Sequence, residues 1–158
     1  MKKDRFDLLT KQFSAYEMEF SKDGDLVEII NPFGCENIRV EYIPDDDFTP
    51  YIVYFAFLHS HMRDVEDTVE YIRDLIEGNR FSIEFFKNGA RYFGGDIAAE
   101  ELKDLSYEIL EQYSGYYGLH KLKDLVDSFK LRGWNPKDNF DAVFIISDNG
   151  SVEIIRQD

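Results

Sequence analysis

The spacing of apolar residues along the chain alternates between a period of two and a period of three to four. Strict alternation predicts strands at 16–20, 26–30 and 38–42, each with one apolar and one polar face. The run 51–58, Tyr-Ile-Val-Tyr-Phe-Ala-Phe-Leu, is apolar throughout, which predicts a central strand buried on both faces. Because the connections between these segments are short, we expect the four strands to form an antiparallel meander.

Apolar residues that recur every three or four positions predict helices elsewhere in the chain. A short helix is expected after Asp4 and a longer one after Asp64, because aspartate side chains cap helix N-termini. Gly78 is suited to end the longer helix. Two further helices are predicted, one at about 98–113 and one that ends at Gly133. The residues expected to face inward in the last helix are Leu122, Leu125, Val126 and Phe129.

Turn residues predict three β-hairpins. Asp23-Gly24, Asn88-Gly89 and Asn149-Gly150 each match a two-residue hairpin turn. Such a turn fixes which residues of the two strands lie opposite one another. The pairs predicted in this way are Phe20 with Val27, Phe85 with Tyr92, and Ile145 with Ile154.

These elements together predict an α+β fold. We expect a mainly antiparallel sheet, made of the four-strand meander and two Asn-Gly hairpins, covered by three main helices and a short N-terminal one. The length of 158 residues fits a single domain over 1–158. Aromatic residues on both faces of 51–58 and 81–86 predict extra cover at these strands, which a homodimer interface would provide.

The composition limits which classes of partner and which cellular compartment we expect. The formal net charge is −14, from 32 acidic and 18 basic residues, which argues against nucleic acid and anionic membranes and favours a basic partner. The single cysteine, Cys35, excludes an internal disulfide and fits a reducing compartment. The chain shows no signal peptide and no apolar run of the ~20 residues that span a membrane, so we expect a cytoplasmic protein.

Two histidines are the sharpest candidates for chemistry. His59 and His61 are two positions apart in a predicted strand, so their side chains share a face, as a metal would require. Candidates by type for a third ligand are His120, Cys35 and a carboxylate of 45–47, and spacing selects none of them. This pattern supports a metal-dependent enzyme or a small-molecule-binding protein. The alternative is that both histidines are polar residues at the end of a strand.

The acidic residues support a different interpretation, which we favour. No catalytic motif stands out, so we expect a non-catalytic module without a cofactor that binds a basic protein partner. Small, soluble, acidic inhibitors and immunity-type proteins of bacteria offer an analogy in charge and size. The alternative is that the acidic residues only solvate the surface. The residues expected to bind the partner are Asp45, Asp46, Asp47, Asp67, Glu70, Asp74, Tyr116 and Tyr117.

Overall fold

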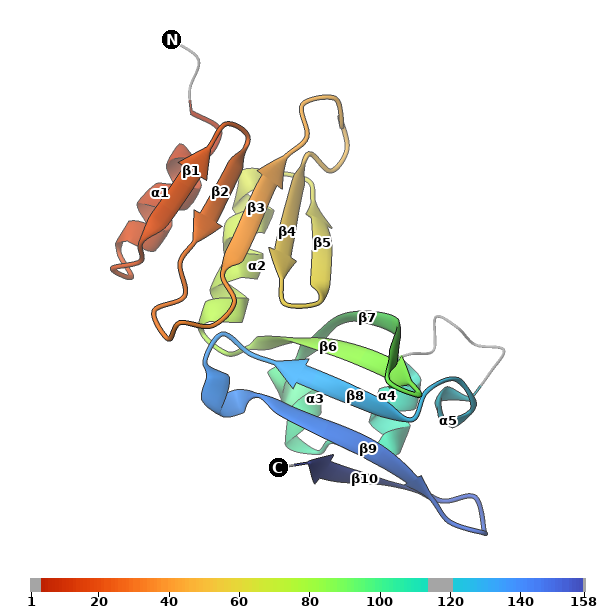
Figure 1. The fold of residues 1–158 in the computed structure, drawn as a ribbon. Coiled ribbons are helices and arrows are strands. Elements are labelled where there is room, and N and C mark those ends of the chain that lie inside the picture. The colour runs from red at the N-terminus through yellow and green to blue at the C-terminus, as the bar shows by residue number, and fades with distance from the viewer. Residues whose placement is uncertain (1–3, 114–120, 158) are drawn as a thin grey trace.

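The computed structural model describes residues 4–113 and 121–157, which form two antiparallel sheets of five strands each and five α-helices (Figure 1). The predicted α+β class is therefore confirmed. In the first sheet the strand order follows the chain, so the meander has five strands instead of four. Its strands are β1 (Phe20–Asp23), β2 (Leu26–Ile29), β3 (Ile38–Tyr42), β4 (Tyr51–Phe55) and β5 (Leu58–Met62).

The second sheet has the strand order β10-β9-β8-β6-β7. Its strand β6 pairs with β7 in a hairpin and with β8, which follows much later in the chain. The strands are β6 (Arg80–Lys87), β7 (Ala90–Ala98), β8 (Ser128–Arg132), β9 (Phe140–Ile146) and β10 (Val152–Gln157).

Each sheet has its own hydrophobic core and its own helices. Helices α1 (Asp7–Ser14) and α2 (Val65–Ile76) contribute to the core of the first sheet. Helices α3 (Ala99–Lys103), α4 (Tyr107–Tyr113) and α5 (Leu122–Leu125) lie at the second sheet. Residues of α4 and α5 belong to its core, and half-buried residues of α3 pack against that core. The predicted cap of α2 is present, because the Asp64 carboxylate accepts a hydrogen bond from the Asp67 N–H at 2.8 Å. That all of this forms a single domain stays a prediction.

The apolar run 51–58 is not one strand, and that prediction was wrong. The chain turns at Ala56 and Phe57, and β5 returns beside β4 with Phe55 opposite Leu58. Ala56 takes a left-handed backbone with φ 51°. In β4, Tyr51, Val53 and Phe55 are buried while the residues between them are half-buried, so one face of β4 packs on the core.

The predicted helix that ends at Gly133 was also wrong. Within residues 121–133 only Leu122–Leu125 is helical, and the chain then forms β8, which lies between β6 and β9. In β8, Phe129 and Leu131 are buried, and they alternate with Lys130 and Arg132, which are half-buried. This period of two suits a strand, and pairing with two neighbours stabilises it.

The predicted helix at 98–113 is divided into α3 and α4. The break begins at Asp104, whose φ of −117° and ψ of 41° are not helical. Ser106 then starts the second helix, since its side-chain oxygen accepts a hydrogen bond from the Ile109 N–H at 3.3 Å. Ser106 therefore caps a second helix within the stretch for which the apolar spacing predicts a single one.

The three predicted hairpins form, but their registers were wrong. The first loop is Gly24-Asp25, one residue later than predicted. In the second hairpin, a bulge after Phe85 leaves Tyr92 without a paired residue on β6. The third loop has three residues, 148–150. The first strand also begins late, at Phe20. The observed pairs are Phe20 with Ile29, Phe85 with Phe93, and Ile145 with Glu153.

The turn between β4 and β5 joins the first sheet to the second. The Phe57 N–H donates to Ser82 Oγ at 3.2 Å, and the Phe57 carbonyl accepts from Arg91 at 3.3 Å. The Phe57 ring packs edge to face on Phe86, with ring centroids 6.3 Å apart. All three partners belong to β6 and β7, so one turn is held by two polar contacts and one aromatic contact.

The segment after β8 contacts the first sheet in turn. Trp134 is 3% exposed and belongs to the core of the first sheet, where its ring lies 6.2 Å from that of Phe55. Its carbonyl accepts a hydrogen bond from the buried Asn31 side chain at 3.0 Å. Each half of the chain therefore places one residue against the other sheet: Phe57 contacts β6 and β7, and Trp134 lies in the core of the first sheet.

Candidate functional site

Strand β5 forms one edge of the first sheet, and half of its backbone faces outward. Its two-residue turn makes Phe55 and Leu58 a hydrogen-bonded pair, so Leu58, Ser60 and Met62 bond to β4. The N–H and C=O groups of His59 and His61 therefore point away from the sheet. Sheet edges are commonly protected by prolines, lysines or bulges, and β5 has none of these.

A groove lies between this edge and helix α2. Its cavity volume is about 440 Å³. On α2 it is lined by Asp67, Glu70 and Asp74, which are three and four positions apart and so lie on one side of the helix. Tyr71 of α2 also lines it, and the groove is completed by His61 and Met62 of β5, Arg63 after β5, and Arg80 at the start of β6. The structure thus brings together His61 and three acidic residues that the sequence suggested separately.

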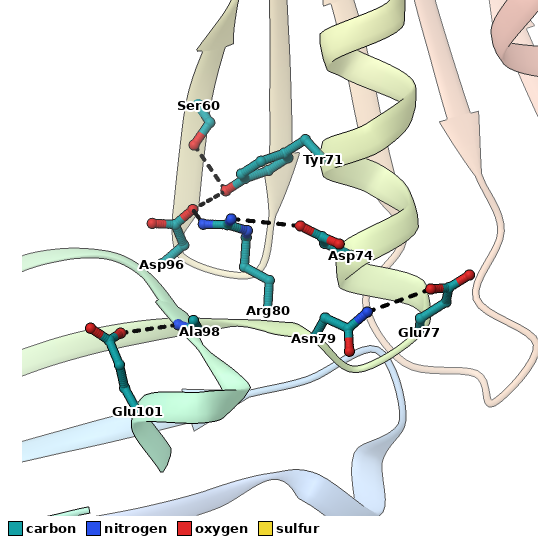
Figure 2. Close-up of polar contacts among 9 residues, drawn as sticks. All are labelled: Ser60, Tyr71, Asp74, Glu77, Asn79, Arg80, Asp96, Ala98 and Glu101. Atoms are coloured by element: carbon teal, nitrogen blue, oxygen red, sulfur yellow. Dashed lines mark hydrogen bonds and ion pairs between the residues drawn. The ribbon is translucent and has the colours of Figure 1, made fainter. Parts of the chain in front are cut away.

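A network of polar side chains connects the groove to the second sheet (Figure 2). The Tyr71 hydroxyl accepts a hydrogen bond from Ser60 at 2.9 Å and donates one to Asp96 at 2.8 Å. Arg80 donates to the same Asp96 oxygen at 2.8 Å and lies 3.6 Å from an Asp74 oxygen. The network therefore fixes α2, β5, β6 and β7 relative to one another.

The environment of this network shifts two pKa values. Burial raises the pKa of Tyr71 far above its usual value, and the nearby Asp96 carboxylate raises it further. Burial acts to lower the pKa of Arg80, but the charge and hydrogen bond of Asp96 outweigh it, so the pKa of Arg80 is raised. Tyr71 is thus held neutral and Arg80 charged.

The three carboxylates on α2 differ in how firmly they are paired. Asp74 is paired with Arg80, within the network. Asp67 is paired with Arg63 at 2.9 Å, but the Arg63 side chain is 76% exposed, so an incoming cation can replace it at little cost. Glu70 is exposed, and no ion pair or hydrogen bond links it to another described residue. Glu70 and Asp67 are the carboxylates most open to a basic ligand.

The predicted acidic loop connects β3 to β4, at the end of the sheet where β5 stops (Figure 1). Asp46 has a structural role there, because it accepts hydrogen bonds from the N–H groups of Thr49 and Phe48 at 2.8 and 2.9 Å. These bonds lower the pKa of Asp46. Asp45 and Asp47 are exposed on either side of it. Of the three predicted aspartates, these two are free to meet a partner.

Phe48 is a residue in this loop that the sequence reasoning missed. Its side chain is 85% exposed, the largest exposure among the large apolar residues of the described part of the chain. Exposed aromatic residues are common anchors in protein interfaces. The available signal was a lone aromatic among prolines and aspartates. Tyr116 and Tyr117, which were predicted for the anchoring role, lie outside the described residues.

The two histidines lie side by side on the exposed face of β5. Their ring centroids are 5.7 Å apart, and the His59 ring lies 6.3 Å from that of Tyr54 on β4. Within residues 4–113 and 121–157, no group of three or more His, Cys, Asp or Glu residues could hold a metal ion. Cys35 is exposed between β2 and β3, and His120 lies outside the described residues. Metal binding by this pair stays a hypothesis with two ligands.

Comparisons with known proteins do not assign this chain to a family. In the described part of the chain, no helix has both the length and the apolar character needed to cross a membrane. The chain matches no protein-family model, no curated protein and no solved structure at a significant level.

Proposed function

We propose that this protein is a non-catalytic binding module that docks a basic protein partner. The docking surface consists of the groove between β5 and α2 together with the loop 45–48. An inhibitor or immunity-type role, in which the acidic surface covers a basic cleft, is the form of this function that fits the net charge of −14.

One observation supports this proposal above the others. Asp67, Glu70 and Asp74 line a single groove beside an unprotected sheet edge. Acidic residues that only solvated a surface would have no reason to face a groove of this volume. The exposed ring of Phe48 at the same end of the sheet offers apolar contact area, which charge alone cannot supply.

The proposal is tested by capture of partners from the lysate of the native organism at low and at high salt. The bait is the full chain, compared with a groove variant, Asp67→Asn/Glu70→Gln/Asp74→Asn, and a loop variant, Asp45→Asn/Asp47→Asn. Asp46 is left intact because it stabilises its own loop. We expect one basic partner at low salt, less of it at high salt, and a loss of about tenfold or more with the groove variant.

The matched control removes three negative charges elsewhere. Glu108, Asp148 and Glu153 are exposed residues far from the groove in sequence, and Glu108→Gln/Asp148→Asn/Glu153→Gln reduces the net negative charge by the same amount. We expect this variant to retain the partner. Equal loss in both variants would mean that total charge, and not the groove, governs binding. Full retention by the groove variant would refute the proposed surface.

A further inference from the structure

We propose that the partner binds as an extended segment that adds to β5 as a sixth strand of the first sheet. This inference rests on the proposed function and specifies how the partner is recognised. The occupant is a segment of the basic partner with lysine or arginine at alternate positions.

The free backbone of β5 provides the first part of the argument. Two N–H and two C=O groups, those of His59 and His61, face outward along this edge. They match the groups that an added strand would present, and peptide recognition by strand addition uses this match. Two of the other three edges are less suitable: β1 carries Lys22, and β7 contains the bulge opposite Phe85.

The position of the groove provides the second part. A strand added to β5 would lie about 4.8 Å from it, with alternate side chains on the side of α2. Those side chains would enter the groove and reach Glu70 and Asp67. The intervening side chains would lie on the exposed face, beside the imidazoles of His59 and His61. An extended segment therefore contacts both candidate features at once.

The charges decide which kind of segment fits. With Arg63 displaced, Asp67 and Glu70 both require a cation, and the two are one helical turn apart. Residues two apart in a strand are separated by roughly 7 Å, so lysines or arginines at alternate positions can serve both. A second copy of this chain would instead bring another net charge of −14. Charge complementarity thus selects a basic partner.

The first test uses a synthetic peptide of about eight residues with alternating lysine and threonine. A second peptide has the same side chains but N-methylated backbone amides, which cannot donate hydrogen bonds. We expect the unmodified peptide to bind the full chain about tenfold more tightly by calorimetry, since several backbone bonds are lost in the other. Binding should also slow hydrogen exchange at the amides of His59 and His61.

The second test changes the backbone of the protein. His61→Pro removes an outward N–H and breaks no bond to β4, as is tolerated in edge strands. His61→Thr removes the same imidazole but keeps the N–H. We expect peptide affinity to fall about tenfold further with proline than with threonine. If the proline variant does not fold, the exchange experiment on the unaltered chain still decides.

Three outcomes would overturn the inference: equal affinity for the two peptides, binding of neither, or unchanged exchange at both histidines. Equal affinity that is lost in the groove variant would leave acidic docking intact and remove only strand addition. The proposed function fails independently, through full retention of the partner by the groove variant in the capture experiment.

Discussion

Glu84 is a carboxylate residue without solvent contact on the face of β6 that the β4–β5 turn covers. Its side chain is 0% exposed and forms an ion pair with Arg91 of β7. Lys130 stands opposite it on β8. A buried carboxylate without such a cation is costly, since its charge loses hydration and gains nothing in return. Arg91 also donates to the Phe57 carbonyl, so one guanidinium supports both a buried charge and the docked turn.

Removal of Arg91 should therefore destabilise the protein more than removal of an ordinary surface cation. For Arg91→Met we expect the free energy of unfolding in urea to fall by about 2–3 kcal/mol, because the buried Glu84 loses the cation with which it forms an ion pair. Lys137→Met, at an exposed cation of the segment after β8, should change it by less than about 0.5 kcal/mol.

A double variant tests the cause. Arg91→Met/Glu84→Met removes the buried charge together with its partner, so most of the lost stability should return. If the Arg91→Met variant were as stable as the original protein, Arg91 would not stabilise the buried charge of Glu84.

Some residue-scale features could be predicted from sequence because they depend on near neighbours. Asp64 caps α2, and Asn88 and Gly89 form their turn with φ of 50° and 77°. The burial of Glu84 could not be predicted, because it depends on a turn more than 20 residues away in the chain. The lone aromatic Phe48 among prolines and aspartates was a signal, but its exposure depends on how the loop packs on the sheet, which local sequence does not fix.

At the scale of elements, the turn between β4 and β5 explains why the run 51–58 was misread. Turns are usually marked by glycine, asparagine or proline, and this one is formed by Ala56 and Phe57. Ala56 adopts φ 51°, which costs an L-residue about 1–2 kcal/mol. Contacts of Phe57 with the second sheet compensate for this cost, and sequence patterns do not show such contacts.

Glycine at this position should stabilise the protein. For Ala56→Gly we expect the free energy of unfolding to rise by about 0.5–1 kcal/mol, because glycine adopts positive φ without steric cost. Ala90→Gly, at an exposed strand residue with ordinary φ, should lower it by about 0.5–1 kcal/mol. Thermal and chemical denaturation of both variants would measure this. Destabilisation by Ala56→Gly would show that the turn is not strained.

The misread strand β8 shows a second limit at this scale. The spacing of Leu122, Leu125 and Phe129 fits one face of a helix, and Phe129 with Leu131 fits one face of a strand. What makes the segment a strand is its pairing with β9 and, above all, with β6, which lies far earlier in the chain. Hydrophobic periodicity alone therefore could not decide between them.

At the scale of the whole molecule, the candidate site depends on how strands are ordered. The acidic residues of α2 and the two histidines could be selected from sequence, because composition and spacing mark them. The groove that unites His61 with Asp67 and Glu70 could not. It exists because β5 lies at a sheet edge and because Arg80 and Tyr71 close one end.

The Tyr71 network should make stability depend on alkaline pH. Tyr71 has an ordinary pKa of 10.0 when unfolded and a raised pKa when folded, so its stabilising effect is complete below pH 10. Above that pH the unfolded chain ionises first, and stability falls as pH rises toward the folded pKa. Tyr71→Phe cannot ionise and loses this dependence.

Urea denaturation between pH 7 and 11 would test this dependence. At pH 7 we expect Tyr71→Phe to be about 1 kcal/mol less stable than the original protein, through loss of its hydrogen bonds. Between pH 9 and 11 that difference should shrink by about 1 kcal/mol. Tyr92→Phe, at an exposed tyrosine of β7, serves as the control. A constant difference across this range would refute the role of Tyr71.

The position of Trp134 gives the molecule an internal optical probe. It is the one tryptophan of the chain, and although it follows a strand of the second sheet, its indole is enclosed in the first core. Its emission wavelength will therefore follow water entry at the seam between the two halves. Partial unfolding confined to the second core would leave that emission unchanged. It would instead alter the near-ultraviolet circular dichroism of the aromatic residues in the second core. A single fluorophore thus distinguishes separation of the sheets from melting of one of them.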